Sequence, residues 1–149
     1  MKNPLKEDIA GIPCTSISLQ LLVNQLVVNL TGTLIQNKIV VENEVSSEFK
    51  MLTDLTSVVP VINELLTTVV ANARNTCILI TAEKFSDVVT LSIQDRNNFN
   101  GYALSFSLMA IGQHARFIGG DISIEGAQKR VATVSFSFPD IPGMKRYAY

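Results

Sequence analysis

The sequence predicts an α+β fold, a two-layer α/β sandwich with a mixed sheet and three helices on one face. Two observations predict it. Segments occur in the order helix, two strands, three times over, and paired strands favour a sheet whose helices gather on one face. The 149 residues are 47% hydrophobic and only 17% charged, against ~25% charged in an average protein. We therefore expect one domain over residues 16–140, with a flexible lead-in at 1–15 and a tail at 141–149.

The first helix is expected from Ser16 to about Asn37, in the most unusual part of the chain. Between Asp8 and Lys38 the only ionisable acid or base is the thiol of Cys14. Polar residues interrupt this stretch, so it is not a membrane span, which needs about 20 mostly apolar residues. One apolar stripe has helical spacing and consists of Leu19, Leu22, Leu26, Leu30 and Leu34.

A second apolar flank lies off that stripe, at Leu21, Val28 and Ile35. One buried face does not need it. We therefore expect this flank to form a self-association or partner surface.

Strand-like alternation then predicts two short strands, 38–45 and 49–52, joined by a turn at 46–47. The next helix should run from about Asp54, which can cap it, to Asn75. Pro60 falls inside this segment and implies a late start or a kink, because proline cannot donate a helical hydrogen bond.

The second half of the chain repeats the pattern. A polar loop at 95–102 precedes a helix from about Ala103 to Ile118, and Gly119 with Gly120 ends it, as glycine at a left-handed cap does. The expected strands are 78–83 and 88–94 before this helix, and 121–125 and 131–138 after it.

This order resembles the ATP-binding (Bergerat) domain of histidine kinases, whose fold type II topoisomerases and anti-sigma-factor kinases share. The resemblance covers about residues 16–139. Three segments carry it: the strand pair at 38–54, the strand ending in Asp95, and the last helix with its Gly-Gly end at 107–124. The closing strand at 133–139 also fits. It implies cytoplasmic two-component-like signalling and a site for ATP and magnesium.

The resemblance implies that Asp95 corresponds to the aspartate that accepts the adenine amino group. In the family, glycines after that aspartate let the backbone pass close to the base. Here the bulky or polar run 96–99 stands in their place. A strand-end turn residue is an equally weighted interpretation of Asp95.

The family also has a helix whose asparagines hold the magnesium ion, and here its register is open. Asn72 with the following alanine looks like the family's asparagine-alanine pair, which would make Glu64 the water-activating glutamate and put Thr68 in place of the first asparagine. That register requires an extra helical turn. Without it, which we favour slightly, Glu64 and Thr68 replace the two asparagines and Pro60 replaces the glutamate. In both registers, spacing of i, i+4 and i+8 puts the three on one helix face.

The phosphate side departs most from the family. Its glycine-rich run becomes residues 102–108, and Gly101 is the glycine that remains nearby. The connection from Asp95 to the last helix is shorter than a mobile lid. His114 lies inside that helix and is interpreted as a structural or surface residue rather than a phospho-acceptor.

These departures predict a degenerate domain, an interaction module without kinase activity and with no cofactor. Its expected partner is a signalling protein such as a response regulator or sensor domain, and a homodimer is possible. A net charge of -1 does not favour nucleic acid or anionic membrane. The alternative is a divergent histidine or anti-sigma-type serine kinase. It would bind ATP through Asp95 and magnesium through Asn72 or Thr68.

Overall fold

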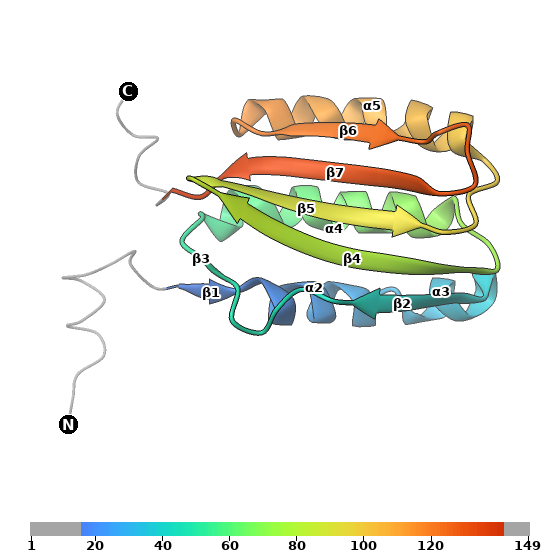
Figure 1. The fold of residues 1–149 in the computed structure, drawn as a ribbon, viewed down its shortest axis with the longest axis horizontal. Helices are drawn as coiled ribbons and strands as arrows, with labels where there is room; N and C mark the ends of the chain where they lie inside the picture. Colours follow the sequence, from blue (N-terminus) through green and yellow to red (C-terminus); the bar gives the residue numbers. More distant parts are fainter. Residues whose placement is uncertain (1–15, 142–149) are drawn as a thin grey trace.

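The computed structural model describes residues 16–141; the predicted lead-in at 1–15 and residues 142–149 of the predicted tail lie outside them. The elements follow the expected order (Figure 1). In chain order they are β1 (Ile17–Ser18), α2 (Leu19–Val28), α3 (Thr31–Asn37), β2 (Ile39–Asn43), β3 (Lys50–Met51), α4 (Leu55–Ala71), β4 (Thr76–Phe85), β5 (Val88–Asp95), α5 (Gly101–Phe117), β6 (Asp121–Glu125) and β7 (Ala132–Pro139).

The main sheet has five strands in the order β2-β4-β5-β7-β6. β2 runs parallel to β4, and the other three neighbouring pairs are antiparallel, so the predicted mixed sheet is confirmed. The expected pairing of the two strands in 38–52 is wrong: β3 instead pairs with β1 in a separate two-stranded sheet. The connection over 44–49 therefore carries the chain away from the main sheet instead of closing a hairpin.

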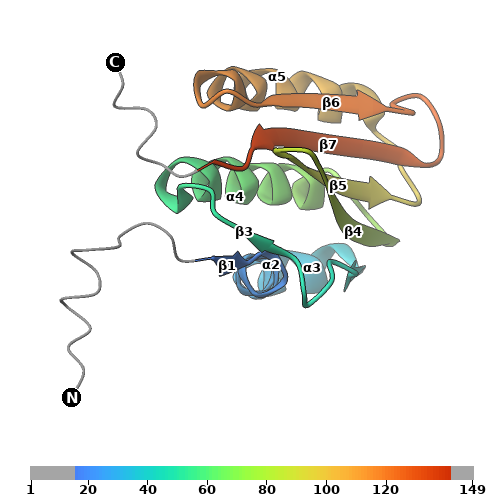
Figure 2. The same ribbon diagram turned by 60° about the vertical axis from the view of Figure 1, so that its left-hand side comes forward.

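Helices α4 and α5 cover one face of the sheet, while α2 and α3 run beside β2 and contact α4 (Figures 1 and 2). Alternate residues of β5 and β7 are buried under the helices, as period-2 alternation requires. The opposite face carries cross-strand hydroxyl pairs, Thr90 with Ser137 at 3.0 Å and Ser92 with Ser135 at 3.4 Å. A single covered face gives the two layers predicted from the sequence.

The predicted first helix is divided into two, so residues 16–141 form four helices instead of three. α2 ends at the cap residue Asn29, and the Thr31 hydroxyl donates to the Val28 carbonyl at 2.7 Å where α3 begins. The predicted apolar flank is solvent-exposed: Leu21 is 65%, Val28 62% and Ile35 73% exposed. This flank contributes no burial to the core.

Asp54 caps α4 as predicted, since its side chain accepts a hydrogen bond from the Thr56 amide at 3.1 Å. Pro60 lies inside the helix, which still begins at Leu55, so the expected late start is wrong. The apolar stripe of α4 is fully buried and explains why the helix persists through a proline; it comprises Val58, Val61, Ile62, Leu65, Leu66, Val69 and Val70.

Replacing Gly119 with valine should destabilise the fold by about 1–2 kcal/mol, because Gly119 has φ +85 and a left-handed backbone is costly for a residue with Cβ. The amides of Gly119 and Gly120 donate to Arg116 and Ala115 carbonyls and close the end of α5. Thermal unfolding followed by circular dichroism measures the loss. Gly32→Val is the control, since nothing lies within 4 Å of its added Cβ. An unchanged melting temperature for Gly119→Val would contradict the prediction.

Within residues 16–141, none of the helices combines the length and the apolar character that crossing a membrane demands.

Candidate functional site

Asp95 is the last residue of β5 and lies on the side of the sheet that the helices cover. Its alternation with Leu91 and Ile93 fixes that orientation, and it is 2% exposed. Its Oδ1 accepts a hydrogen bond from the Thr76 hydroxyl at 2.7 Å and another from the Asn97 amide at 3.0 Å. The carboxylate is thus held in one orientation at the sheet end, and it also closes the turn after β5.

The connection between Asp95 and α5 is bound to the hairpin between β6 and β7. The Asn98 amide donates to the Arg130 carbonyl at 2.7 Å. The Asn98 side-chain amide donates to the carbonyls of Ala127 at 3.0 Å and Lys129 at 2.9 Å. Three hydrogen bonds from one residue therefore fasten this connection to the backbone of the β6–β7 hairpin.

Gly101 begins α5 and is buried at the same contact. A Cβ built on Gly101 would lie 1.6 Å from the Ala127 carbonyl oxygen. The space that the missing side chain leaves is filled by the β6–β7 hairpin. The glycine is thus required here by the close approach of two backbone segments.

Three residues predicted for the site lie along one side of α4, next to its buried stripe: Glu64, Thr68 and Asn72. Each of them is half-buried. Glu64 Oε1 lies 2.9 Å from His114 Nδ1, so a hydrogen bond joins α4 to α5. Asn72 is the C-terminal cap of α4, and its side-chain amide donates to the Thr68 carbonyl at 2.9 Å. The side chains of Glu64 and Asn72 are thus each oriented by a hydrogen bond to another protein group.

The residues expected at the two ends of a nucleotide site lie in different surroundings. Asp95, expected at the adenine end, has the Thr76 hydroxyl beside it. Gly101, expected at the phosphate end, packs against the Ala127 backbone. In the part of the chain that the structure describes, no three His, Cys, Asp or Glu side chains group as a metal site.

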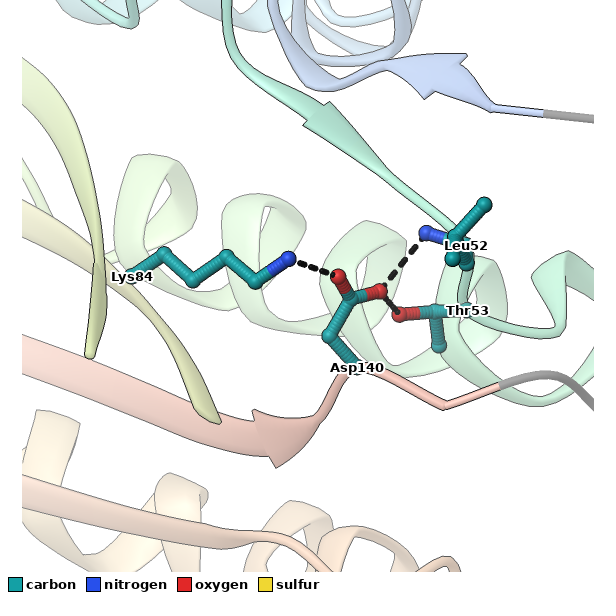
Figure 3. A network of polar contacts seen from close by, with 4 residues as sticks. All are labelled: Leu52, Thr53, Lys84 and Asp140. Atoms are coloured by element: carbon teal, nitrogen blue, oxygen red, sulfur yellow. Dashed lines mark hydrogen bonds and ion pairs between the residues drawn. The ribbon is translucent and has the colours of Figure 1, made fainter. Parts of the chain in front are cut away.

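Two contacts could not be anticipated from the sequence. The partners Glu64 and His114 are far apart in the chain, and no motif links them. A second polar network surrounds Asp140, whose carboxylate accepts hydrogen bonds from the Leu52 amide, the Thr53 hydroxyl and the Lys84 ammonium (Figure 3). Its one signal in the sequence is an aspartate directly after the proline that ends β7.

No protein-family model matches the chain, and no curated protein sequence matches it either. Solved structures do match it. The histidine kinase AdeS of Acinetobacter baumannii has a TM-score of 0.71 at 16% identity, over 85% of this chain and 66% of that one. Full-length ShkA in complex with AMPPNP has a TM-score of 0.69 at 14% identity, over 86% of this chain and 31% of that one.

The histidine kinase ThkA matches in two forms. Its catalytic domain has a TM-score of 0.64 at 20% identity, over 86% of this chain and 97% of that one. ThkA in complex with the response regulator TrrA has a TM-score of 0.61 at 21% identity, over 93% of this chain and 47% of that one. The match thus extends over almost the whole isolated catalytic domain but under two thirds of the longer kinase chains. This chain has the fold of a histidine kinase catalytic, ATP-binding domain.

Proposed function

We propose that this protein is an interaction module of two-component-like signalling that keeps the histidine kinase ATP-binding fold without kinase activity. The observation that carries the proposal is the fixed position of the connection between β5 and α5. Asn98 donates hydrogen bonds to the β6–β7 hairpin, and Gly101 packs against the backbone of the same hairpin. Phosphoryl transfer depends on positioning and electrostatic stabilisation of the phosphates, and this connection leaves no mobile lid to supply them.

The contacts of α4 support the same proposal. Glu64, the candidate water-activating residue, is paired with His114 at 2.9 Å. Asn72, the candidate magnesium ligand, uses its amide to cap its own helix. These two hydrogen bonds fix the orientation of both side chains on α4.

The proposed partner is a response regulator or a sensor domain. The kinase ThkA, which has this fold, has been crystallised with a response regulator. On α5 the exposed residues Tyr102, Phe106 and Met109 are 73%, 76% and 64% exposed. They follow one another at helical spacing, and no charged residue occurs between Gly101 and Gln113. Exposed apolar surface of this kind is typical of protein–protein contacts.

A divergent ATP-binding kinase is the second candidate, and the position of Asp95 favours it. A buried aspartate beside a threonine at the end of β5 offers an acceptor for an adenine amino group. ShkA, which has this fold, has been solved with AMPPNP. In this alternative Asn72 or Thr68 would be the magnesium ligand.

Thermal unfolding with and without ~1 mM magnesium-ATP separates the two candidates. Ligand at 100 times its dissociation constant stabilises a protein by ~2.7 kcal/mol, a shift of several degrees for a chain of this size. We expect no shift that depends on Asp95, so the wild type and Asp95→Asn should respond alike. A rise in melting temperature that Asp95→Asn abolishes would refute the interaction-module proposal and favour the kinase.

A further inference from the structure

A shallow depression of about 500 Å³ lies at the end of the sheet where β5 ends and β4 and β7 begin, the right-hand end in Figure 1. Three cationic side chains line it: Lys38, Arg96 and Arg130. They come from the α3–β2 junction, the turn after β5 and the β6–β7 hairpin. None of the residues Glu64, Thr68 and Asn72 takes part in it.

The three cations have no carboxylate partner within residues 16–141, where the ion pairs join other residues. Arg96 donates from Nε to the neutral side chain of Gln94 at 3.2 Å, which leaves the rest of its guanidinium available. Burial and the carboxylate of Glu42 raise the pKa of the Cys77 thiol in the same lining, so the thiol adds no negative charge near neutral pH. Three cationic side chains without a carboxylate partner therefore line one depression, while the carboxylates of Glu42, Glu44 and Asp95 lie near the other lining residues.

The floor of the depression is held by hydrogen bonds before any ligand arrives. The Asn97 side-chain amide donates to the Asn75 carbonyl at 3.1 Å, and the Thr76 hydroxyl donates to Asp95 at 2.7 Å. The Thr76 amide donates to the Lys38 carbonyl at 3.3 Å. A floor fixed in this way reduces the ordering that binding would otherwise require.

Backbone conformation gives a second, independent observation. Lys38, the C-terminal cap of α3, has φ 57, and Asn75 has φ 49. Glycine is the usual residue at a left-handed helix end, and asparagine tolerates this conformation better than lysine does. Such costly conformations gather at functional sites. A lysine at this position places a positive charge in the depression at the expense of stability.

We propose that this depression binds a small anion carrying two or more phosphate groups. Arginine recognises phosphate through paired N–H donors, and lysine adds a point charge, so the lining matches phosphate chemistry. Three cations from separate elements around one open depression suit a ligand with more than one phosphate group. The site requires no adenine contact and does not depend on the proposed signalling role, and it shares Thr76 and Asn97 with the surroundings of Asp95.

Inorganic pyrophosphate is the probe, titrated by calorimetry at constant ionic strength, with orthophosphate as the weaker ligand. We expect saturable pyrophosphate binding that Arg96→Gln and Arg130→Gln each weaken about 10-fold. Lys129→Gln is the matched control, because it removes the neighbouring charge outside the depression. Equal affinity of Arg130→Gln and Lys129→Gln, or no saturable binding by the wild type, would overturn the proposal.

Lys38→Gly supplies a readout that a merely structural role would not give. Glycine relieves the left-handed conformation and removes the charge, so the variant should melt at a higher temperature and bind pyrophosphate about 10-fold more weakly. A variant that is more stable and binds pyrophosphate as well as the wild type would remove Lys38 from the site and contradict the proposal.

Discussion

Gly101→Ala should destabilise the protein by about 3 kcal/mol, a fall of roughly 6–12 °C in melting temperature. The added Cβ would lie 1.6 Å from the oxygen and 2.6 Å from the carbon of the Ala127 carbonyl. Both contacts are with backbone, so no side-chain rotation can relieve them. Either α5 or the β6–β7 hairpin must move, and the hydrogen bonds of Asn98 to Ala127 and Lys129 would be lost with that movement. Thermal and urea unfolding measure the effect.

Gly112→Ala is the matched control, because it lies in the same helix. Its Cβ would lie 3.5 Å from an Arg116 guanidinium nitrogen, a flexible group. Alanine favours a helix over glycine by about 1 kcal/mol, so this variant should be as stable as the wild type or more stable. Similar losses in Gly101→Ala and Gly112→Ala would show that the hairpin contact is not the cause.

Asp140→Asn should cost about 2–3 kcal/mol at neutral pH, because it removes the negative charge that three donors share. The Asp140 side chain is 0% exposed and lies 2.6 Å from the Lys84 ammonium. The Leu52 amide and the Thr53 hydroxyl each donate to it at 2.7 Å (Figure 3). The network joins the residue after β7 to β4 and to the segment before α4. Its loss should therefore weaken the contacts among these three parts of the fold. Urea unfolding measures the change.

The same carboxylate should make stability depend on pH. Burial alone would raise the pKa of Asp140, but hydrogen bonds from Lys84, Thr53 and Leu52 outweigh burial and hold the pKa below its usual value. A carboxyl group whose pKa is lower in the folded state stabilises the protein above its unfolded pKa, ~3.9. That stability is lost as pH falls through the folded pKa.

The wild type should therefore lose this contribution below about pH 4, and Asp140→Asn should lack that part of the pH dependence. Asp121→Asn is the control, because Asp121 is exposed and lies 4.0 Å from Arg116. An exposed ion pair of this kind contributes 0–1 kcal/mol. Parallel stability curves for the wild type and Asp140→Asn between pH 7 and pH 3 would refute the assignment.

Much of the fold could be predicted because side-chain periodicity reports burial directly. The alternation in 88–95 and the stripe of α4 both mark a single buried face. Partners in the sheet could not be predicted in the same way. β2 lies parallel to β4, a strand that comes after an intervening helix, and no local pattern near Ile39 indicates this. The break at Asn29 has no signal in the sequence, because apolar residues continue through it at helical spacing.

In the candidate site, too, local features could be predicted and long-range contacts could not. The location of Asp95 could be predicted, since it follows from the phase of a strand. The loop after Asp95 is held in place because the Asn98 side chain donates hydrogen bonds to carbonyls about 30 residues later in the chain. No local sequence pattern predicts that contact. The pairing of Glu64 with His114 is equally distant. Predictions therefore succeeded where neighbouring residues decide the structure and failed where contacts between remote segments decide it.

The position of β7 has a consequence for how the domain folds. β7 comes last among the strands, yet it lies between β5 and β6 and supplies hydrogen bonds to both. Until Ala132 and the residues after it arrive, β6 has no neighbour in the sheet and β5 exposes an edge that invites intermolecular pairing. Folding must therefore wait for a long-range insertion, which is slow and exposes the chain to aggregation during synthesis.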